Sequence, residues 1–103
     1  MYKRQELREY LSDVIEDLEG PIYLSLDMDA IDPAFAPGVG TPEPLGMTPY
    51  EVIQTINFFS DRIVGFDCVE VCPPHDNGNT SALAARLIRH LVGAVWQSQQ
   101  RFK

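Results

Sequence analysis

The sequence predicts an α/β fold in which two parallel strands alternate with three helices. Apolar residues recur at three- and four-residue steps over residues 5–18, 49–59 and 80–97, the spacing of a helix with one buried face. Residues 22–27 and 62–71 are short apolar runs rich in strand-forming residues. Strict alternation of the two patterns is typical of a parallel sheet, so the connection between the strands is expected to be right-handed.

Length and charge limit the possible functions. At 103 residues the chain is one domain or less. Its net charge of −7 argues against nucleic acid and acidic membrane as partners and favours a cationic ligand. No apolar run is long enough to span a membrane, and no signal-peptide core follows the first residues. We therefore expect a cytoplasmic protein.

The first helix, 5–18, leads directly into the first strand, 22–27. Gly20 and Pro21 stand where a helix ends. The apolar face of this helix is expected to be Leu7, Leu11, Val14, Ile15 and Leu18.

The first strand ends in acid, at Asp27 and Asp29. In an extended chain, residues two apart project on the same side. Two like charges at the end of a buried strand are costly unless a cation neutralises them. Carboxylate oxygens suit manganese or magnesium. The spacing by itself fits equally well one solvated aspartate and one aspartate that caps a loop.

Residues 28–47 are rich in proline and glycine, so regular structure is not expected there. An ordered loop of this length usually has a function, and the alternative is a flexible surface excursion. The helix 49–59 then begins with Thr48 as N-cap, Pro49 in the first turn and Glu51 at the capping-box position. Its apolar stripe is expected to be Val52, Ile53, Ile56 and Phe59.

The second strand, 62–71, is apolar on both faces, as in a strand covered on both sides. A polar loop follows, and Asn79 or Thr80 is expected to cap the helix 80–97. Cys68 and Cys72 lie too far apart along the chain for easy bridging, so we expect two free, buried thiols. The helix is expected to bury Leu83, Leu87, Ile88, Leu91, Val92 and Val95. A sheet of two strands leaves both edges open, which predicts a partner.

Two blocks of the sequence resemble the ureohydrolase family, the arginases, agmatinases and relatives that hydrolyse guanidino groups at a two-manganese centre. The first block is Ser25-Leu-Asp-Met-Asp29 with Asp32-Pro33, Pro37-Gly38, Gly40-Thr41-Pro42 and Gly46. The second is Gly65-Phe-Asp-Cys-Val-Glu-Val-Cys-Pro-Pro74. The resemblance implies that residues 1–103 form an agmatinase-like, carboxyl-terminal segment, a partial three-layer α/β/α sheet of the arginase type.

Ligands of open α/β sheets gather beyond the carboxyl ends of the strands. The resemblance implies that Asp27 bridges two manganese ions and that Asp29 chelates one of them. It implies that Glu70 is a catalytic carboxylate that pairs with the substrate guanidinium or polarises its surroundings, with the Thr41 hydroxyl beside that group. Without the resemblance, Glu70 is an ordinary strand-end charge.

Four other residues could be mistaken for metal ligands. We expect Asp32 to bond to its own backbone and Asp67 to be structural. His75 is expected to be exposed and His90 to lie on the surface of its helix. Many agmatinase-like relatives carry an aromatic residue at the position of His75, which leaves its substrate-side role open.

The resemblance implies four further metal ligands, two histidines and two aspartates, from amino-terminal motifs of the family. Residues 1–103 do not contain these motifs. The first hypothesis is therefore an agmatinase-like hydrolase, inactive alone and completed by an amino-terminal segment, that acts on a small cationic guanidino substrate. Pro73-Pro74 favours agmatine. The second is a non-catalytic, oligomerising α/β remnant or subunit. A fragment, a split-gene product and a truncated remnant remain alternatives. We expect a homo-oligomer, and we expect the chain alone to bind manganese weakly.

Overall fold

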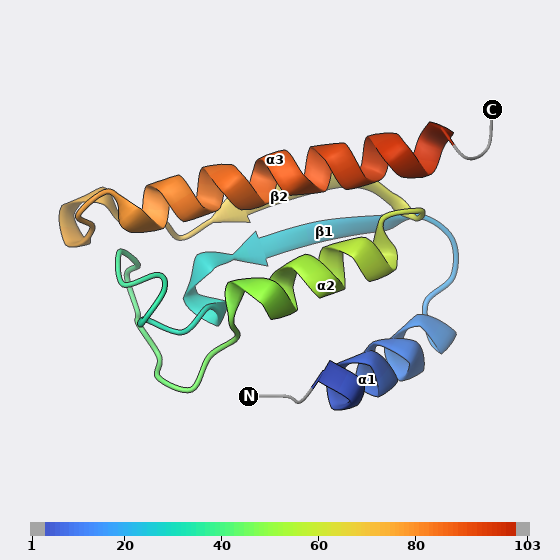
Figure 1. Cartoon of the computed structure of the whole chain (residues 1–103), viewed down its shortest axis with the longest axis horizontal. Helices are drawn as coiled ribbons and strands as arrows, with labels where there is room; N and C mark the ends of the chain where they lie inside the picture. Colours follow the sequence, from blue (N-terminus) through green and yellow to red (C-terminus); the bar gives the residue numbers. More distant parts are fainter. Residues whose placement is uncertain (1–3, 101–103) are drawn as a thin grey trace.

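The computed structural model describes residues 4–100. The chain forms two parallel strands and three α-helices, with a short 3₁₀ helix after each strand (Figure 1). The α-helices are α1 (Arg4–Glu16), α2 (Pro49–Phe59) and α3 (Asn79–Gln100), the strands are β1 (Ile22–Asp27) and β2 (Ile63–Val69), and the 3₁₀ helices are η1 (Met28–Ala30) and η2 (Pro73–His75). This is the predicted order of elements.

One face of the sheet carries the core. In β1 the half-buried Leu24 and Leu26 pack against the core, and Phe66 of β2 does the same. Helices α2 and α3 pack against each other, α3 also packs against β2, and α1 packs against α2. The fully buried centre comprises Met28, Ile31, Val39, Ile56 and Leu87.

The opposite face of the sheet is open within residues 4–100. The alternate side chains of β1, namely Tyr23, Ser25 and Asp27, are exposed, and Tyr23 keeps 63% of its surface. In β2, Val64 and Val69 are also exposed. The prediction that both faces of the second strand are covered is therefore wrong for the described part of the chain. An apolar sequence is typical of a strand that is covered on both faces, whereas residues 4–100 cover only one face of this sheet.

Helix α2 and strand β1 have the predicted bounds. Thr48 caps α2 by accepting a hydrogen bond from the Glu51 backbone N–H at 3.2 Å, and the Glu51 carboxylate accepts one from the Thr48 N–H at 2.9 Å. Val52, Ile56 and Phe59 are buried on the predicted stripe. These signals are local, so the sequence carries them completely.

Three other boundaries differ from the prediction. Helix α1 ends at Glu16, so Leu18 lies beyond it and is exposed. Strand β2 covers 63–69 instead of 62–71, because Glu70 has a left-handed backbone (φ 75°) that breaks the ladder. Helix α3 runs from 79 to 100 instead of 80 to 97, and Val92 is 52% exposed instead of buried.

The loop 28–47 has more structure than its composition indicates. It begins with η1 and contains two isolated bridges, Ile31 with Met47 and Val39 with Val71. Cys68 and Cys72 are free thiols, as expected, but both are half-buried instead of buried. Over residues 4–100, no helix combines the length and the apolar character needed to cross a membrane.

Candidate functional site

The parallel pairing of β1 and β2 brings the acidic positions to one edge. Asp27 lies opposite Val69 in the register, and Glu70 follows Val69 directly. The carboxyl ends of the two strands therefore meet where the sequence places its acids. We call Asp27, Asp29, Thr41 and Glu70, with the loop segment that joins them, the acidic rim.

The sequence spacing had indicated that Asp27 and Asp29 both lie in extended chain. The structure differs from this prediction. The backbone turns into η1 immediately after Asp27. Asp27 caps this turn, and its Oδ1 accepts a hydrogen bond from the Asp29 N–H at 2.9 Å. Asp27 is exposed and Asp29 is half-buried. The two carboxylates are thus held by a capped turn instead of by the pleat of a strand.

The Asp29 carboxylate has a buried oxygen without a partner. Its Oδ1 is inaccessible and forms no hydrogen bond within the described chain. A buried polar atom of this kind usually has a ligand, a water molecule or an ion as its partner. The oxygen donors of Asp27 and Asp29 fit a hard divalent cation in chemistry. They do not fit in number, because the described residues contain no group of three or more His, Cys, Asp or Glu able to hold a metal.

Asp32 and Gly46 close the base of the loop 28–47. Asp32 accepts hydrogen bonds from the Ala34 N–H at 2.9 Å and from the Gly46 N–H at 3.2 Å. Two backbone bonds of 2.8 Å add to this base, from the Asp32 N–H to the Met47 carbonyl and from the Met47 N–H to the Ala30 carbonyl. A Cβ on Gly46 would lie 2.7 Å from the Asp32 nitrogen, so only glycine fits there. Asp32 therefore organises the loop, as expected.

The middle of the same loop is fastened to the segment after β2. Gly38 donates its N–H to the Thr80 hydroxyl at 2.8 Å, and its carbonyl accepts from the Cys72 N–H at 2.8 Å. A side chain on Gly38 would overlap Asp76. The loop is thus an ordered part of the site, held between the end of β2 and the start of α3.

Glu70 is exposed and sits on a strained backbone. A φ of 75° is uncommon for glutamate and costs free energy. Residues with such strained backbones are concentrated at functional positions. Its Oε2 lies 3.8 Å from the point where a Cβ on Gly40 would stand. Thr41, the next residue, is exposed on the same loop. The structure therefore brings the segment around Thr41 to Glu70, although the two residues are 29 positions apart in the sequence.

Asp67 lies on the open face of the sheet. It pairs with Ser25, two residues before the pair of Asp27 and Val69. It accepts hydrogen bonds from the Ser25 hydroxyl at 2.6 Å and the Tyr23 hydroxyl at 3.0 Å. The hydrogen bond to Asp67 raises the pKa of Tyr23. Burial raises the pKa of the neighbouring Cys68 thiol, and the charges of Asp67 and Asp27 add to this. Ser25 and Asp67 therefore tie the two strands together below the rim.

Both histidines bond to other elements. His75 is exposed, as expected, and its Nδ1 donates to the Val39 carbonyl at 3.1 Å. His90 is half-buried instead of lying free on the surface, and its Nε2 is 2.8 Å from the Asn57 Oδ1. His75 thereby supports the loop beside the rim, whereas His90 joins α3 to α2.

Asp76 is the structural residue that the sequence analysis missed. Its carboxylate accepts hydrogen bonds from the Thr80 N–H and the Ser81 N–H, each at 3.0 Å, and from the Ser81 hydroxyl at 2.9 Å. The prediction that Asn79 or Thr80 caps α3 is therefore wrong, since both lie inside the helix. The signal in the sequence was an aspartate just before an Asn-Gly turn.

We expect Asp76→Asn to destabilise the fold at neutral pH and not near pH 2. Partial burial alone raises the pKa of Asp76, but the hydrogen bonds from Ser81 and Thr80 outweigh it and lower the pKa from 3.8 to about 2. A lowered folded-state pKa contributes stability above the unfolded value, and this contribution is lost as pH falls toward the folded value. Urea unfolding of both proteins across this pH range measures the difference. A stability difference that stays constant with pH would assign the effect to something other than the carboxylate charge.

Comparisons with known proteins agree on one family. A family model described as "Arginase family" matches residues 1–93. The human mitochondrial guanidino acid hydrolase is 48% identical over 77 residues, which are 73% of this chain and 22% of that protein. The chicken (Gallus gallus) mitochondrial agmatinase is 45% identical over 89 residues, 84% of this chain and 24% of that protein.

Solved structures give the same result. The agmatine ureohydrolase of Thermoplasma volcanium matches with a TM-score of 0.86 and 41% identity, over 95% of this chain and 33% of that one. The proclavaminate amidino hydrolase of Streptomyces clavuligerus matches with a TM-score of 0.81 and 37% identity, over 89% and 32% respectively. The chain thus spans between 22% and 33% of the length of these relatives.

Proposed function

Because the chain belongs to the arginase family and has its α/β fold, we propose that it forms the carboxyl-terminal part of an agmatinase-like ureohydrolase. The complete protein hydrolyses a guanidino C–N bond and releases urea, and an amino-terminal segment supplies what this chain lacks. One observation carries the proposal. Two separate segments, one ending in Asp27 and Asp29 and the other in the strained Glu70, meet at the carboxyl edge of the sheet.

Manganese is the metal that the family resemblance implies, with two ions in the complete site. Asp27 and Asp29 would hold it, and the buried, unpartnered Oδ1 of Asp29 supports this assignment. When bound, the metal supplies Lewis-acid activation of water. Two carboxylates are far fewer than the roughly six donors such an ion prefers, so this chain alone binds it weakly.

The chain's own contribution to chemistry is to position the substrate. The Glu70 carboxylate accepts hydrogen bonds from the planar guanidinium group and fixes its orientation. The loop stem closed by Asp32 and Gly46 fixes the loop that bears Thr41, whose hydroxyl contacts the same group. The residues on both sides of Glu70 are paired, Val69 with Asp27 and Val71 with Val39, so the backbone that carries the carboxylate is held on both sides.

Charge favours agmatine over guanidino acids. Agmatine carries two positive charges, whereas a guanidino acid carries one positive and one negative charge. The rim presents Asp27, Asp29 and Glu70, and the whole chain carries a net charge of −7. A negative surface raises the local concentration of a dication more than that of a zwitterion. Relatives with either kind of name match the chain, so both substrates belong in the test.

The experiment is co-expression with an amino-terminal segment taken from a related agmatinase, followed by a urea-release assay with manganese. We expect urea from agmatine, less from guanidinobutyrate, and none from this chain alone. A stable complex that retains manganese and releases no urea from either substrate contradicts the proposal.

The second candidate is a non-catalytic, oligomerising subunit. The exposed face of the sheet, with Tyr23 and Val69 on its surface, favours it, because such a face and two open strand edges promote association. Sedimentation of the chain alone, together with the urea assay, separates the two candidates. Self-association without urea release in any complex supports the second, and a stable monomer at tens of micromolar contradicts it.

A further inference from the structure

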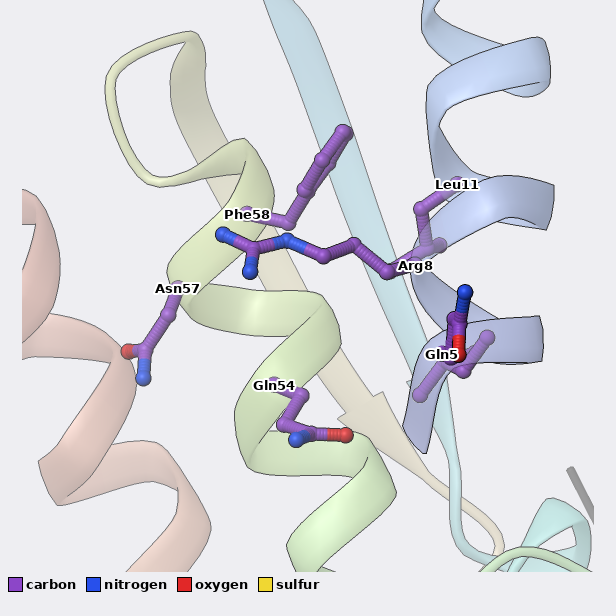
Figure 2. A pocket seen from close by; sticks show the side chains of 7 residues that line it. Gln5, Arg8, Leu11, Gln54, Asn57 and Phe58 are labelled. Carbon is purple, nitrogen blue, oxygen red and sulfur yellow. The ribbon is translucent and has the colours of Figure 1, made fainter. Parts of the chain in front are cut away.

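A pocket of about 520 Å³ lies between α1 and α2, and no residue of the acidic rim lines it (Figure 2). Its floor is apolar and firmly placed. Leu7 and Leu11 of α1 are 3% and 6% exposed. Phe58 of α2 is half-buried, and its ring contacts that of Phe59 edge to face, with centroids 5.1 Å apart. Such a floor can cover a short apolar chain.

Arg8 is the cation of this pocket. Figure 2 shows its side chain reaching from α1 toward α2, with the guanidinium group beside Phe58. No acidic side chain lines the pocket. The positions three and four residues before and after Arg8, where a helical ion pair would form, hold Arg4, Gln5, Leu11 and Ser12. A chain with 15 acidic residues therefore places none of them at these positions around this guanidinium.

Two carboxamide side chains line the pocket together with Arg8. Gln5 comes from α1 and Gln54 from α2, and both side chains are seen at the pocket in Figure 2. Asn57 also belongs to the lining, but its side chain points away from Arg8 in Figure 2, and its Oδ1 is bonded to His90 of α3. The polar groups of the pocket thus offer N–H donors from the two glutamine side chains as well as from Arg8.

We propose that this pocket binds a small carboxylate with a short apolar chain. The carboxylate pairs with the Arg8 guanidinium, whose planar fork matches two carboxylate oxygens. The amides of Gln5 and Gln54 complete the donor set, and the chain lies on Leu7, Leu11 and Phe58. The site is separate from the acidic rim and does not depend on the proposed hydrolase activity.

A second pocket serves as an internal control. It has a volume of about 640 Å³ and lies between α2 and α3, where Arg86, Arg89 and His90 line it. It contains more positive charge than the first pocket, but its lining offers no large apolar side chain. A ligand attracted by charge alone would prefer this second pocket, whereas a ligand that needs both charge and an apolar floor prefers the first.

The test is a titration of the full chain with hexanoate, followed by amide signals in nuclear magnetic resonance spectra. We expect saturable shifts at residues 5–11 and 54–58, with a dissociation constant on the order of a millimolar. Acetate, which lacks the apolar chain, and hexylamine, which lacks the negative charge, should bind at least about tenfold more weakly.

Matched variants locate the anion. Arg8→Gln should weaken hexanoate binding by about tenfold or more, and Arg8→Lys by less, because lysine keeps the charge and loses the fork. Arg89→Gln should change nothing. The proposal is overturned if hexanoate gives no saturable shift, if hexanol binds as well as hexanoate, or if Arg8→Gln and Arg89→Gln have equal effects. Arg8 is exposed, so its variants should keep the wild-type spectrum outside the pocket.

Discussion

Asp27→Asn in the completed protein is expected to abolish urea release and manganese retention together. The asparagine Oδ1 can still accept the hydrogen bond from the Asp29 N–H that is 2.9 Å long in the native turn, so the fold around η1 is kept. What disappears is the negative charge at the carboxyl end of β1. A metal pair that loses one anionic ligand is under-neutralised and dissociates. Metal analysis after gel filtration and the urea assay measure the two effects on one sample.

Asp67→Asn is the matched control. Asp67 is on the same face of the sheet, but its carboxylate is bonded to Ser25 and Tyr23 and is not at the rim. It should therefore lower stability while the protein keeps its manganese. If Asp27→Asn retains both ions and still releases urea, or if Asp67→Asn loses manganese as readily, the assignment of Asp27 as a ligand is wrong.

Glu70→Gln is expected to lower turnover by about two orders of magnitude or more while manganese content is unchanged, the scale of losing one positioned charge in an active site. Glutamine keeps the size of the side chain and the strained backbone, so only the charge that holds the guanidinium is removed. Measurement of kcat, KM and bound manganese on the same preparation tests this. A variant that loses its manganese would place Glu70 among the metal ligands instead.

Thr41→Ala is the variant against which the loss of turnover in Glu70→Gln is compared. It removes one neutral hydrogen bond, worth about 1 kcal/mol, so the rate should fall by roughly fivefold. An effect of Thr41→Ala as large as that of Glu70→Gln would show that the loop, and not the charge, controls turnover.

Local sequence signals predicted the order of helices and strands, but they predicted the ends of some elements and the burial of some side chains less well. The bounds of β1 and α2 follow from residues in contact along the chain, such as Thr48 with Glu51. The end of β2 coincides with the left-handed backbone of Glu70. The next residue, Val71, pairs with the distant Val39, and no local pattern encodes that contact. Val92 has the helical spacing of a core residue, yet within residues 4–100 it is 52% exposed.

The geometry of the candidate site differs from what the spacing of its residues had indicated. The spacing of Asp27 and Asp29 indicated one side of a strand, but a 3₁₀ turn that Asp27 itself caps holds them. The acids of the two segments meet because the strands are parallel neighbours, which the alternation of helices and strands had predicted. Asp76 was missed because its cap acts across the turn at Asn77 and Gly78, upstream of the first helical residue.

The closed base of the loop 28–47 and the fastening of its middle at Gly38 leave the segment 42–45 free to change. Asp32, Gly46 and Met47 hold the two ends of the loop with bonds that involve backbone atoms, and Leu45 is 87% exposed. Substitutions at residues 42–45 therefore leave the base and the acids intact. In evolutionary terms, this separates the part of the loop that must be inherited unchanged from the part in which new substrate preferences can arise at little cost to folding.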